Sequence, residues 1–274
     1  MHLKYLLLCS CLLFTTLSKA QLFEEDKNFT AADSLLKESG FSIHKDNYFI
    51  TGLPLNETPT STNTDVKYQI SFKQRLSKRP LLGGFFPYLL YTQKAFWDIY
   101  ANSKPFSELN FNPGIAVVRP FYLKGKRLTY ASISLEHESN GRDSIYSKTW
   151  NYFAFSLKSQ VSPRWMVGLR GWIPMVDKED NPDLIKYVGY GEASATYQIK
   201  PGRWTADLIF RKGSGVLNYG SFQSHLNFKP YKKENYYITL QWFVGYTESL
   251  IDYQQHKSML RLGFVLKPEG MSIF

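Results

Sequence analysis

From residue 46 onward, hydrophobic and polar residues alternate in short segments separated by turns. Side chains two apart in a strand share a face, so this alternation indicates strands with one apolar and one polar side. The sequence predicts twelve such strands, at 46–53, 66–75, 88–97, 112–122, 128–138, 149–159, 164–173, 188–198, 203–211, 219–228, 236–246 and 257–266. The predicted class is all-β, with no linker and no second domain.

Two all-β architectures are compatible with this pattern, a soluble β-sandwich and a membrane β-barrel. The chain contains 20 Phe, 19 Tyr and 6 Trp, yet its mean hydropathy is negative. Barrels hide their hydrophobicity in this way, because only alternate residues face the lipid. Tilted strands of about 9–11 residues can cross a bilayer, and bacterial single-chain barrels have an even number of strands. We therefore expect a twelve-stranded antiparallel transmembrane β-barrel.

The first twenty residues have the features of a cleaved signal peptide. A basic start at Lys4 precedes the apolar run 6–14, which is too short to span a bilayer, and the segment ends on the small residue Ala20. We expect the mature chain to begin at Gln21, and lipid attachment at Cys11 is the alternative. Both cysteines lie in this segment, so the mature protein would have no disulfide.

These patterns divide the chain into a signal peptide at 1–20, a polar periplasmic lead-in at 21–45 and an outer-membrane β-barrel at 46–274. A short helix is predicted within the lead-in, at 31–37. Removal of residues 1–20 would lower the formal net charge from +10 to +8 (31 basic minus 23 acidic residues). This moderate excess suits an anionic lipid surface but is equally compatible with simple solubility. Net charge alone therefore does not identify a partner.

The direction of the strands follows if both termini face the periplasm, because odd-numbered strands then run outward. The connections 98–111, 138–148 and 174–187 become extracellular loops, and 76–87 and 123–127 become inner turns. Short inner turns and longer outer loops are typical of bacterial barrels.

Polar residues interrupt the apolar face where two neighbouring strands meet the outer rim. His137 and Ser139 have the same parity as Leu135, and Asn151 has the same parity as Phe153. All three polar side chains are therefore expected to point toward lipid. An unpaired polar group costs several kcal/mol in hydrocarbon, so polar residues on this face are functional candidates.

These three side chains suit acyl transfer. A serine hydroxyl is a weak nucleophile until a neighbouring imidazole takes its proton, and the imidazole needs a partner that fixes its tautomer. The sequence predicts Ser139 as nucleophile, His137 as base and Asn151 as orienting group, and an amide avoids the desolvation of a carboxylate. The alternative is that His137 and Ser139 are rim residues wetted by the headgroup region, because short motifs often arise by chance.

Residues 137–142, around the triad, are His-Glu-Ser-Asn-Gly-Arg, and 147–151 are Ser-Lys-Thr-Trp-Asn. This pattern resembles the signature of the outer-membrane phospholipase A family. The resemblance extends along most of the mature chain, through Tyr-Thr-Gln-Lys at 91–94 with Trp97, Asp-Asn-Pro-Asp at 180–183 with Lys186 and Tyr187, and Glu-Ser-Leu-Ile-Asp-Tyr at 248–253. Four separated motifs in the right order are far more specific than any one alone.

The resemblance implies a calcium-dependent phospholipase that hydrolyses acyl esters of phospholipids and lysophospholipids (A1/A2 type). It implies a Ser139, His137 and Asn151 triad, with the backbone N–H of Gly141 donating to the oxyanion. It also implies activation by homodimerisation in the outer membrane of a Gram-negative-type bacterium.

The resemblance further implies a calcium site shared between subunits. By position, the Arg142 carbonyl and the Ser147 hydroxyl would bind Ca²⁺, with a further ligand from loop 98–111 of the partner subunit. Ser103 is assigned as that ligand, although Ser-Lys-Pro-Phe at 103–106 matches the family pattern only loosely. Oxygen ligands suit Ca²⁺, which is a hard cation.

Gln93 is a candidate for a subunit contact on independent grounds. Lys94 must face the barrel interior, so Tyr91, Gln93 and Trp97 face outward. A glutamine in that apolar set suggests a contact in which its amide finds a partner. The alternative is an amide in the interfacial belt.

Two other functions remain open from the sequence. One is a catalytically inactive or porin-like structural outer-membrane barrel, and the other is a soluble β-sandwich lectin. All three triad residues are present, which favours the enzyme. The expected partners are membrane phospholipids and a second copy of the chain, the expected cofactor is Ca²⁺, and no nucleic acid is expected.

Overall fold

The computed structural model describes residues 31–176, 179, 181–215 and 219–268. The predicted signal peptide at 1–20 lies outside these residues, as does the start of the predicted lead-in, 21–30. None of the helices in the described residues is long and apolar enough to cross a membrane.

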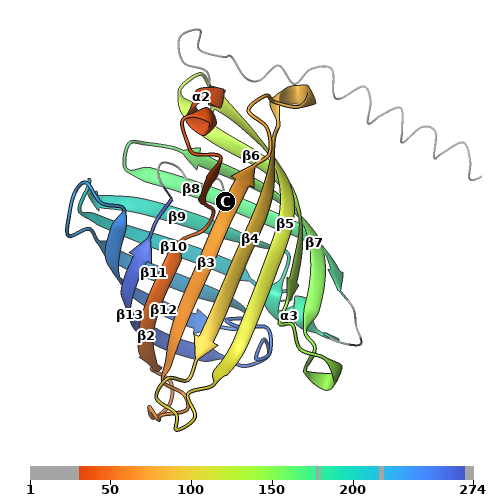
Figure 1. Cartoon of the computed structure of the whole chain (residues 1–274), viewed down its shortest axis with the longest axis vertical. Helices are drawn as coiled ribbons and strands as arrows, with labels where there is room; N and C mark the ends of the chain where they lie inside the picture. The colour runs from red at the N-terminus through yellow and green to blue at the C-terminus, as the bar shows by residue number, and fades with distance from the viewer. Residues whose placement is uncertain (1–30, 177–178, 180, 216–218, 269–274) are drawn as a thin grey trace, which may run out of the picture.

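Twelve long antiparallel strands form one closed barrel (Figure 1). Neighbours in the chain pair with each other, and the last strand pairs with the first through Leu266 opposite Asn47 and Met259 opposite Pro54. The strands are β2 (Asn47–Pro54), β3 (Asp65–Arg75), β4 (Phe86–Trp97), β5 (Phe106–Leu123), β6 (Arg127–Ser139), β7 (Thr149–Gln160), β8 (Trp165–Val176), β9 (Gly191–Lys200), β10 (Trp204–Lys212), β11 (Gly220–Phe228), β12 (Tyr236–Gly245) and β13 (Lys257–Leu266). A short extra strand, β1 (Phe41–Ile43), pairs with β3. The predicted twelve-stranded barrel is confirmed.

Strand β5 begins at Phe106, so the prediction of a strand from 112 and a loop over 98–111 was wrong. Glu108, Asn110 and Asn112 are buried in the barrel, and Leu109 pairs with Ala95 of β4. Inward positions of a barrel are polar, so this part of the strand resembles a loop in its sequence. The outer connection between β4 and β5 is only 98–105.

The outer wall of the barrel is apolar and its interior is polar. On β7, Phe153, Phe155 and Leu157 are 42–47% exposed, whereas Tyr152 and Ala154 between them are buried. The largest fully buried side chains of the described residues include Arg261, Lys73 and Gln241. This distribution is the inverse of that in a water-soluble protein. It is expected of a barrel whose outer wall faces lipid and whose interior is polar.

The two ends of the barrel differ in the length of their connections (Figure 1). Short turns lie at the end where the described chain begins and stops, at 124–126, 161–164 and 201–203. Longer loops lie at the other end, at 55–64, 98–105, 140–148, 177–190 and 246–256. Short turns mark the periplasmic side of such barrels, and we call the two ends the inner end and the outer end.

At the inner end, the segment before the barrel folds into the barrel mouth. Helix α2 (Ala31–Leu36) buries Leu35 in an apolar cluster that includes Tyr88. The Tyr130 hydroxyl, from the barrel wall, donates a hydrogen bond of 2.9 Å to Ser34. A short helix was predicted here, but the sequence did not predict that it packs against β4, β5 and β6 at the inner end of the barrel.

At the outer end, two loops fold inward over an aromatic cluster. Helix α3 (Leu184–Val188) lies in the loop 177–190, and its Leu184 packs with Leu250 of the loop 246–256 against Trp150 and Trp172 of the wall. The Trp172 indole N–H also donates to the Gly189 carbonyl at 2.8 Å. Strand β9, the eighth strand of the barrel, begins at Gly191 rather than at the predicted residue 188, because α3 occupies 184–188.

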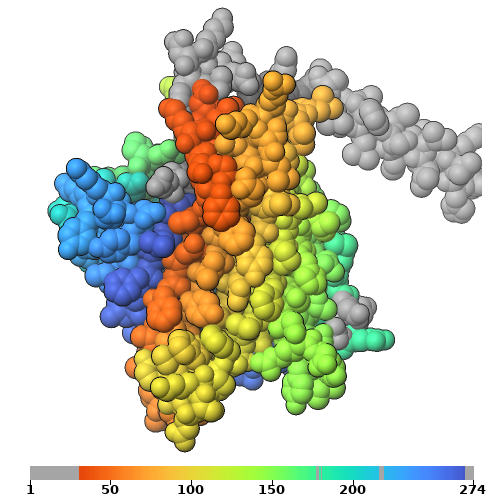
Figure 2. All heavy atoms as spheres, in the orientation of Figure 1, coloured from red at the N-terminus to blue at the C-terminus, as the bar shows by residue number. Residues whose placement is uncertain are grey.

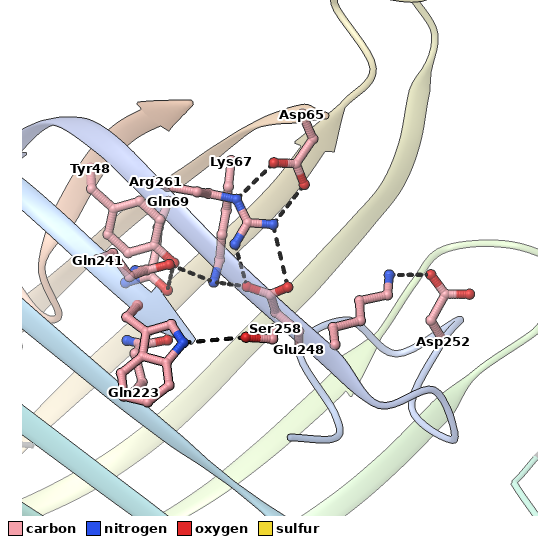
Figure 3. Close-up of polar contacts among 12 residues, drawn as sticks. Tyr48, Asp65, Lys67, Gln69, Gln223, Gln241, Glu248, Asp252, Ser258 and Arg261 are labelled. Atoms are coloured by element: carbon pink, nitrogen blue, oxygen red, sulfur yellow. Dashed lines mark hydrogen bonds and ion pairs between the residues drawn. The ribbon is translucent and has the colours of Figure 1, made fainter. Parts of the chain in front are cut away.

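A buried ionic network fixes the loop 246–256 to the wall (Figure 3). Glu248 accepts hydrogen bonds from Lys67 at 2.9 Å and from Arg261 at 2.6 Å, and Arg261 also pairs with Asp65 at 2.7 Å. Between this outer cluster and the inner helix lies a polar cavity of about 350 Å³, lined by charged side chains such as Lys94. Apolar residues therefore pack at both ends of the described barrel, and charged residues line the space between them.

Candidate active site

The three predicted catalytic residues lie on two adjacent strands near the outer end of the wall. Ser139 is the last residue of β6, His137 lies two residues before it, and Asn151 lies directly opposite His137 on β7. Leu135 and Phe153, their neighbours on the same face, are 37% and 42% exposed on the apolar wall. The three polar side chains thus share the lipid-facing side.

The imidazole and the amide are already engaged with each other. His137 Nδ1 lies 2.9 Å from the Asn151 side-chain oxygen. An amide oxygen only accepts, so this contact places the proton on Nδ1 and leaves the lone pair on Nε2. Among the described residues no hydrogen bond joins Ser139 to the imidazole, but side chains two apart on one strand face are neighbours, and catalytic hydrogen bonds often shorten only when substrate binds.

The opposite face of β6 braces this strand from inside the barrel. Glu136 pairs with Arg170 of β8 and accepts a hydrogen bond of 2.8 Å from the Tyr152 hydroxyl. Glu138 accepts one of 3.1 Å from the Trp150 indole. The residues on either side of His137 are therefore fixed in the lumen, which limits movement of the strand that carries it.

The loop 140–148 is organised by one buried side chain, Asn140. Its amide donates to the Tyr146 carbonyl at 2.9 Å, and its oxygen accepts from the backbone N–H groups of Arg142 and Lys148 at 3.3 and 3.0 Å. Sequence analysis placed Asn140 in the motif but gave it no role. The residue type alone could have suggested this role, because asparagine side chains commonly form hydrogen bonds with the nearby backbone in turns.

Gly141 follows directly and has a conformation suited to glycine. Its φ is +68°, and a Cβ added there would lie 3.0 Å from the Phe111 ring. Phe111 on β5 lies opposite Ser139. The backbone of Gly141 therefore passes close to an aromatic side chain beside the candidate nucleophile, and sequence analysis did not identify Phe111.

The predicted calcium ligands lie in two separate outer loops. Arg142 and Ser147 are both in the loop 140–148, and Ser103 is exposed in the loop 98–105. The Arg142 side chain turns to β5, where its Nε lies 3.4 Å from Glu108. No group of three or more His, Cys, Asp or Glu in the described residues could hold a metal ion.

Gln93 lies on the same row of the wall as the candidate nucleophile. It is opposite Phe111, which is in turn opposite Ser139, so Gln93 is two strands away at about 10 Å. The Tyr91 hydroxyl donates to its side-chain oxygen at 3.0 Å. Lys94 faces the lumen as predicted, 3.6 Å from Glu138. Figure 2 looks onto this side of the barrel, where β4 to β7 form the yellow and green surface.

The fold and the site together define an outer-membrane β-barrel with hydrolase-type residues on its outer wall. A sequence model of the Phospholipase A1 family matches residues 33–266. Phospholipase A1 from Klebsiella pneumoniae is 30% identical over 212 residues, which cover 74% of this chain and 70% of that protein. The chain therefore belongs to the phospholipase A1 family, which confirms the resemblance found in its motifs.

Solved structures show the same fold. Outer membrane phospholipase A from Escherichia coli matches with a TM-score of 0.74 and 24% identity, over 86% of this chain and 97% of that one. The Salmonella typhi outer membrane phospholipase, solved as a dimer with bound calcium, matches with a TM-score of 0.75 and 24% identity, over 89% and 98%. The protein is an outer-membrane barrel, as predicted, and its family is one of phospholipid hydrolases.

Proposed function

We propose that this protein is a calcium-dependent phospholipase with A1 and A2 activity, acting on phospholipids and lysophospholipids through Ser139, His137 and Asn151. The observation that carries this proposal is the His137–Asn151 hydrogen bond of 2.9 Å, formed on the lipid-facing wall beside Ser139. Polar groups are costly in that position unless they have a use, and acyl esters of lipids reach this surface directly.

In the proposed reaction, Ser139 Oγ attacks the acyl carbonyl carbon while His137 Nε2 takes its proton. The oxyanion accepts a hydrogen bond from the Gly141 N–H. The carbon–oxygen bond to glycerol then breaks, and His137 returns the proton to the leaving oxygen. Water, activated by the same imidazole, hydrolyses the acyl-serine and releases the fatty acid.

Asn151 orients the base without adding a charge. Its amide holds His137 in the tautomer with Nε2 free to accept the serine proton. A carboxylate in its place would need desolvation at the lipid face. The neutral partner therefore suits the position of the site.

The loop residues fit a hard cation, although incompletely. The Arg142 carbonyl and the Ser147 hydroxyl are oxygen donors of the kind that Ca²⁺ accepts, but it takes six to eight of them. The Arg142 guanidinium is paired with Glu108, so its positive charge is partly neutralised near such an ion. When bound, Ca²⁺ would supply positive charge beside the oxyanion.

The shortage of ligands supports activation by dimerisation. A second copy would add the Ser103 hydroxyl and waters to the shell, and would place Gln93 at a subunit contact on the same row as Ser139. The calcium-bound dimer of the Salmonella typhi protein supports this arrangement. The apolar walls of two copies would also enclose the acyl chain of a lipid.

The alternative of a porin-like barrel finds no support in the lumen. A pore needs a continuous aqueous path, whereas in the described residues the aromatic cluster around Trp172 packs inside the outer end and α2 packs against β4, β5 and β6 at the inner end. Charged side chains such as Lys94 line the cavity between these two clusters. The aromatic cluster over the outer mouth therefore favours a protein that works on its outer wall.

The test is phospholipid hydrolysis by purified, folded protein with calcium and then with chelator. Ser139→Ala should lose at least about 10³-fold in turnover, because it removes the covalent step. Ser132→Ala is the matched control, since Ser132 lies on the same strand but is buried on the lumen side. Heat-modifiable migration in gels would verify that both variants fold. Near wild-type hydrolysis by Ser139→Ala would remove the core of the proposal.

A further inference from the structure

The positive charge of this protein is concentrated at one end of the barrel. In the inner turns 76–85, 124–126, 161–164, 201–203 and 229–235, the only acid is Glu234. In the outer loops, acidic residues outnumber basic ones in the sequence. Three of the inner turns together carry six exposed cations, which we call the basic collar: Lys78, Arg79, Lys124, Lys126, Lys232 and Lys233.

The six collar cations have no ion-pair partner among the described residues. Lumen cations such as Lys67 and Arg261, in contrast, are paired. Unpaired cations on a solvated surface attract a mobile anion. The collar is therefore available to a partner.

An aromatic belt marks the depth at which these cations lie. Trp165 and Trp204 are the first residues of β8 and β10, directly after inner turns, and are 41% and 37% exposed on the wall. Their rings pack against Tyr197 and Phe228 at 4.6 and 4.7 Å. Aromatic girdles lie at the membrane–water interface, so the adjoining turns lie at the level of lipid headgroups.

One inner turn also carries an exposed apolar tip. Leu82 is 99% exposed and Leu81 is 51% exposed, two to four residues after Lys78 and Arg79. The hairpin 76–85 projects from the inner end of the wall, in gold in Figure 2. Leucine side chains can insert into the lipid interface while neighbouring lysine and arginine side chains keep their charges at the level of the headgroups.

We propose that the basic collar binds the anionic headgroups of glycerophospholipids in the periplasmic leaflet, the phosphoglycerol class in particular. The turn 124–126 joins β5 to β6 and the turn 229–235 joins β11 to β12, on opposite sides of the twelve-stranded barrel. An annulus of lipid touches all sides at once, whereas a single acidic peptide would reach only one. The arrangement therefore favours lipid.

The experiment measures lipid preference around the full-length protein in phosphatidylcholine vesicles. Brominated phosphatidylglycerol and brominated phosphatidylcholine are compared as quenchers of the protein's tryptophan fluorescence. The wild type should prefer phosphatidylglycerol severalfold, and the preference should fall as salt rises, because exposed charges are screened. Lys124→Gln with Lys126→Gln should lower the preference at least about twofold.

A matched variant removes the same net charge at the opposite end. Thr58→Glu with Ser61→Glu alters two exposed residues of the outer hairpin 55–64 and should leave the preference unchanged. Equal loss in both variants would show a response to net charge alone and overturn the proposal, as would no loss in the inner variant.

The other occupant to exclude is an acidic segment of this chain, at Glu24, Glu25 and Asp26. If a preference for phosphatidylglycerol appeared only after Glu24→Gln, Glu25→Gln and Asp26→Asn, that segment rather than lipid would cover the collar. A preference in the wild type that this triple variant leaves unchanged would support the lipid.

Discussion

At the scale of single residues, the backbone conformation and the surroundings of Gly141 both favour glycine over any other amino acid at this position. Its φ of +68° lies in the left-handed region, where a side chain adds strain. A Cβ there would also lie 3.0 Å from the Phe111 ring, which sits beside Ser139. Substitution would therefore shift the proposed oxyanion donor, the aromatic ring, or both.

We predict that Gly141→Ala lowers phospholipid hydrolysis by about 10²-fold or more, the typical cost of losing one oxyanion donor. Gly125→Ala is the control, because its φ is +66° and nothing lies within 4 Å of an added Cβ. The two variants carry the same backbone strain, but only the first crowds the site. Equal activities, measured on folded protein at saturating calcium, would contradict a role for the Gly141 N–H.

The shared face of His137 and Asn151 could be predicted from sequence, because parity along a strand needs no knowledge of register. Their direct opposition across β6 and β7 depends on register, which the structure supplies. The roles of Asn140 and Phe111 were not predicted either, for two different reasons. The role of Asn140 depends on the conformation of a loop, and that of Phe111 depends on the pairing of β5 with β6.

At the scale of elements, the loop 246–256 is held over the outer mouth by one buried carboxylate. Glu248 lies between Lys67 and Arg261, and all three side chains are almost fully buried (Figure 3). Burial would by itself raise the pKa of Glu248, but the positive charges of Arg261 and Lys67 outweigh it and lower that pKa to about 2. The loop also carries Asp252, which pairs with Lys257 near the surface.

Glu248→Gln should lower the free energy of unfolding by about 3–5 kcal/mol, because it leaves two buried cations without their partner. Asp252→Asn should change it by about 1 kcal/mol or less, since that pair is partly solvated. Denaturant unfolding followed by tryptophan fluorescence measures both. A similar, small effect of the two substitutions would show that the buried network does not hold the loop.

The lowered pKa of Glu248 also predicts that the stability of the protein depends on pH. The ordinary pKa of a glutamate is 4.5, and that of Glu248 in the folded protein is about 2. A lowered pKa means that the stabilisation is complete above the unfolded value and is lost as pH falls through the folded value. The wild type should therefore lose its advantage over Glu248→Gln between about pH 4.5 and pH 2. An advantage that persisted below pH 2 would contradict this assignment.

Most elements could be predicted from the sequence, and two of the exceptions concern the interior of the barrel. Alternation located twelve strands, because a lipid-facing wall imposes a period of two. It failed at the start of β5, where Glu108 and Asn110 face a polar lumen, and it could not place α2 within the barrel mouth. The interior of a barrel therefore constrains the pattern of hydrophobic and polar residues along the sequence less than its lipid-facing exterior does.

At the scale of the whole molecule, the aromatic cluster over the outer mouth and the incomplete ligand set of the proposed calcium site direct attention to the wall and to a second copy. Arg142 and Ser147 would supply two oxygens from one loop, while Ser103 is in another. Gln93 lies two strands from Ser139 on the face that a partner would cover. The site as proposed is complete only in the dimer, so calcium affinity and dimerisation must be coupled.

Linkage makes this coupling reciprocal: if dimerisation tightens calcium binding, calcium must tighten the dimer by the same factor. A coupling of about 1–3 kcal/mol corresponds to a 5–150-fold change in the dimer dissociation constant. We expect calcium to raise the dimer fraction of the wild type in detergent, measured by analytical ultracentrifugation against calcium concentration. Ser147→Ala should flatten this dependence because it removes a proposed ligand. Ser144→Ala, in the same loop but outside the proposed ligand set, should leave it unchanged. A wild-type dimer fraction indifferent to calcium would refute the shared site, even if hydrolysis proved calcium-dependent, because the ion would then be held within one subunit.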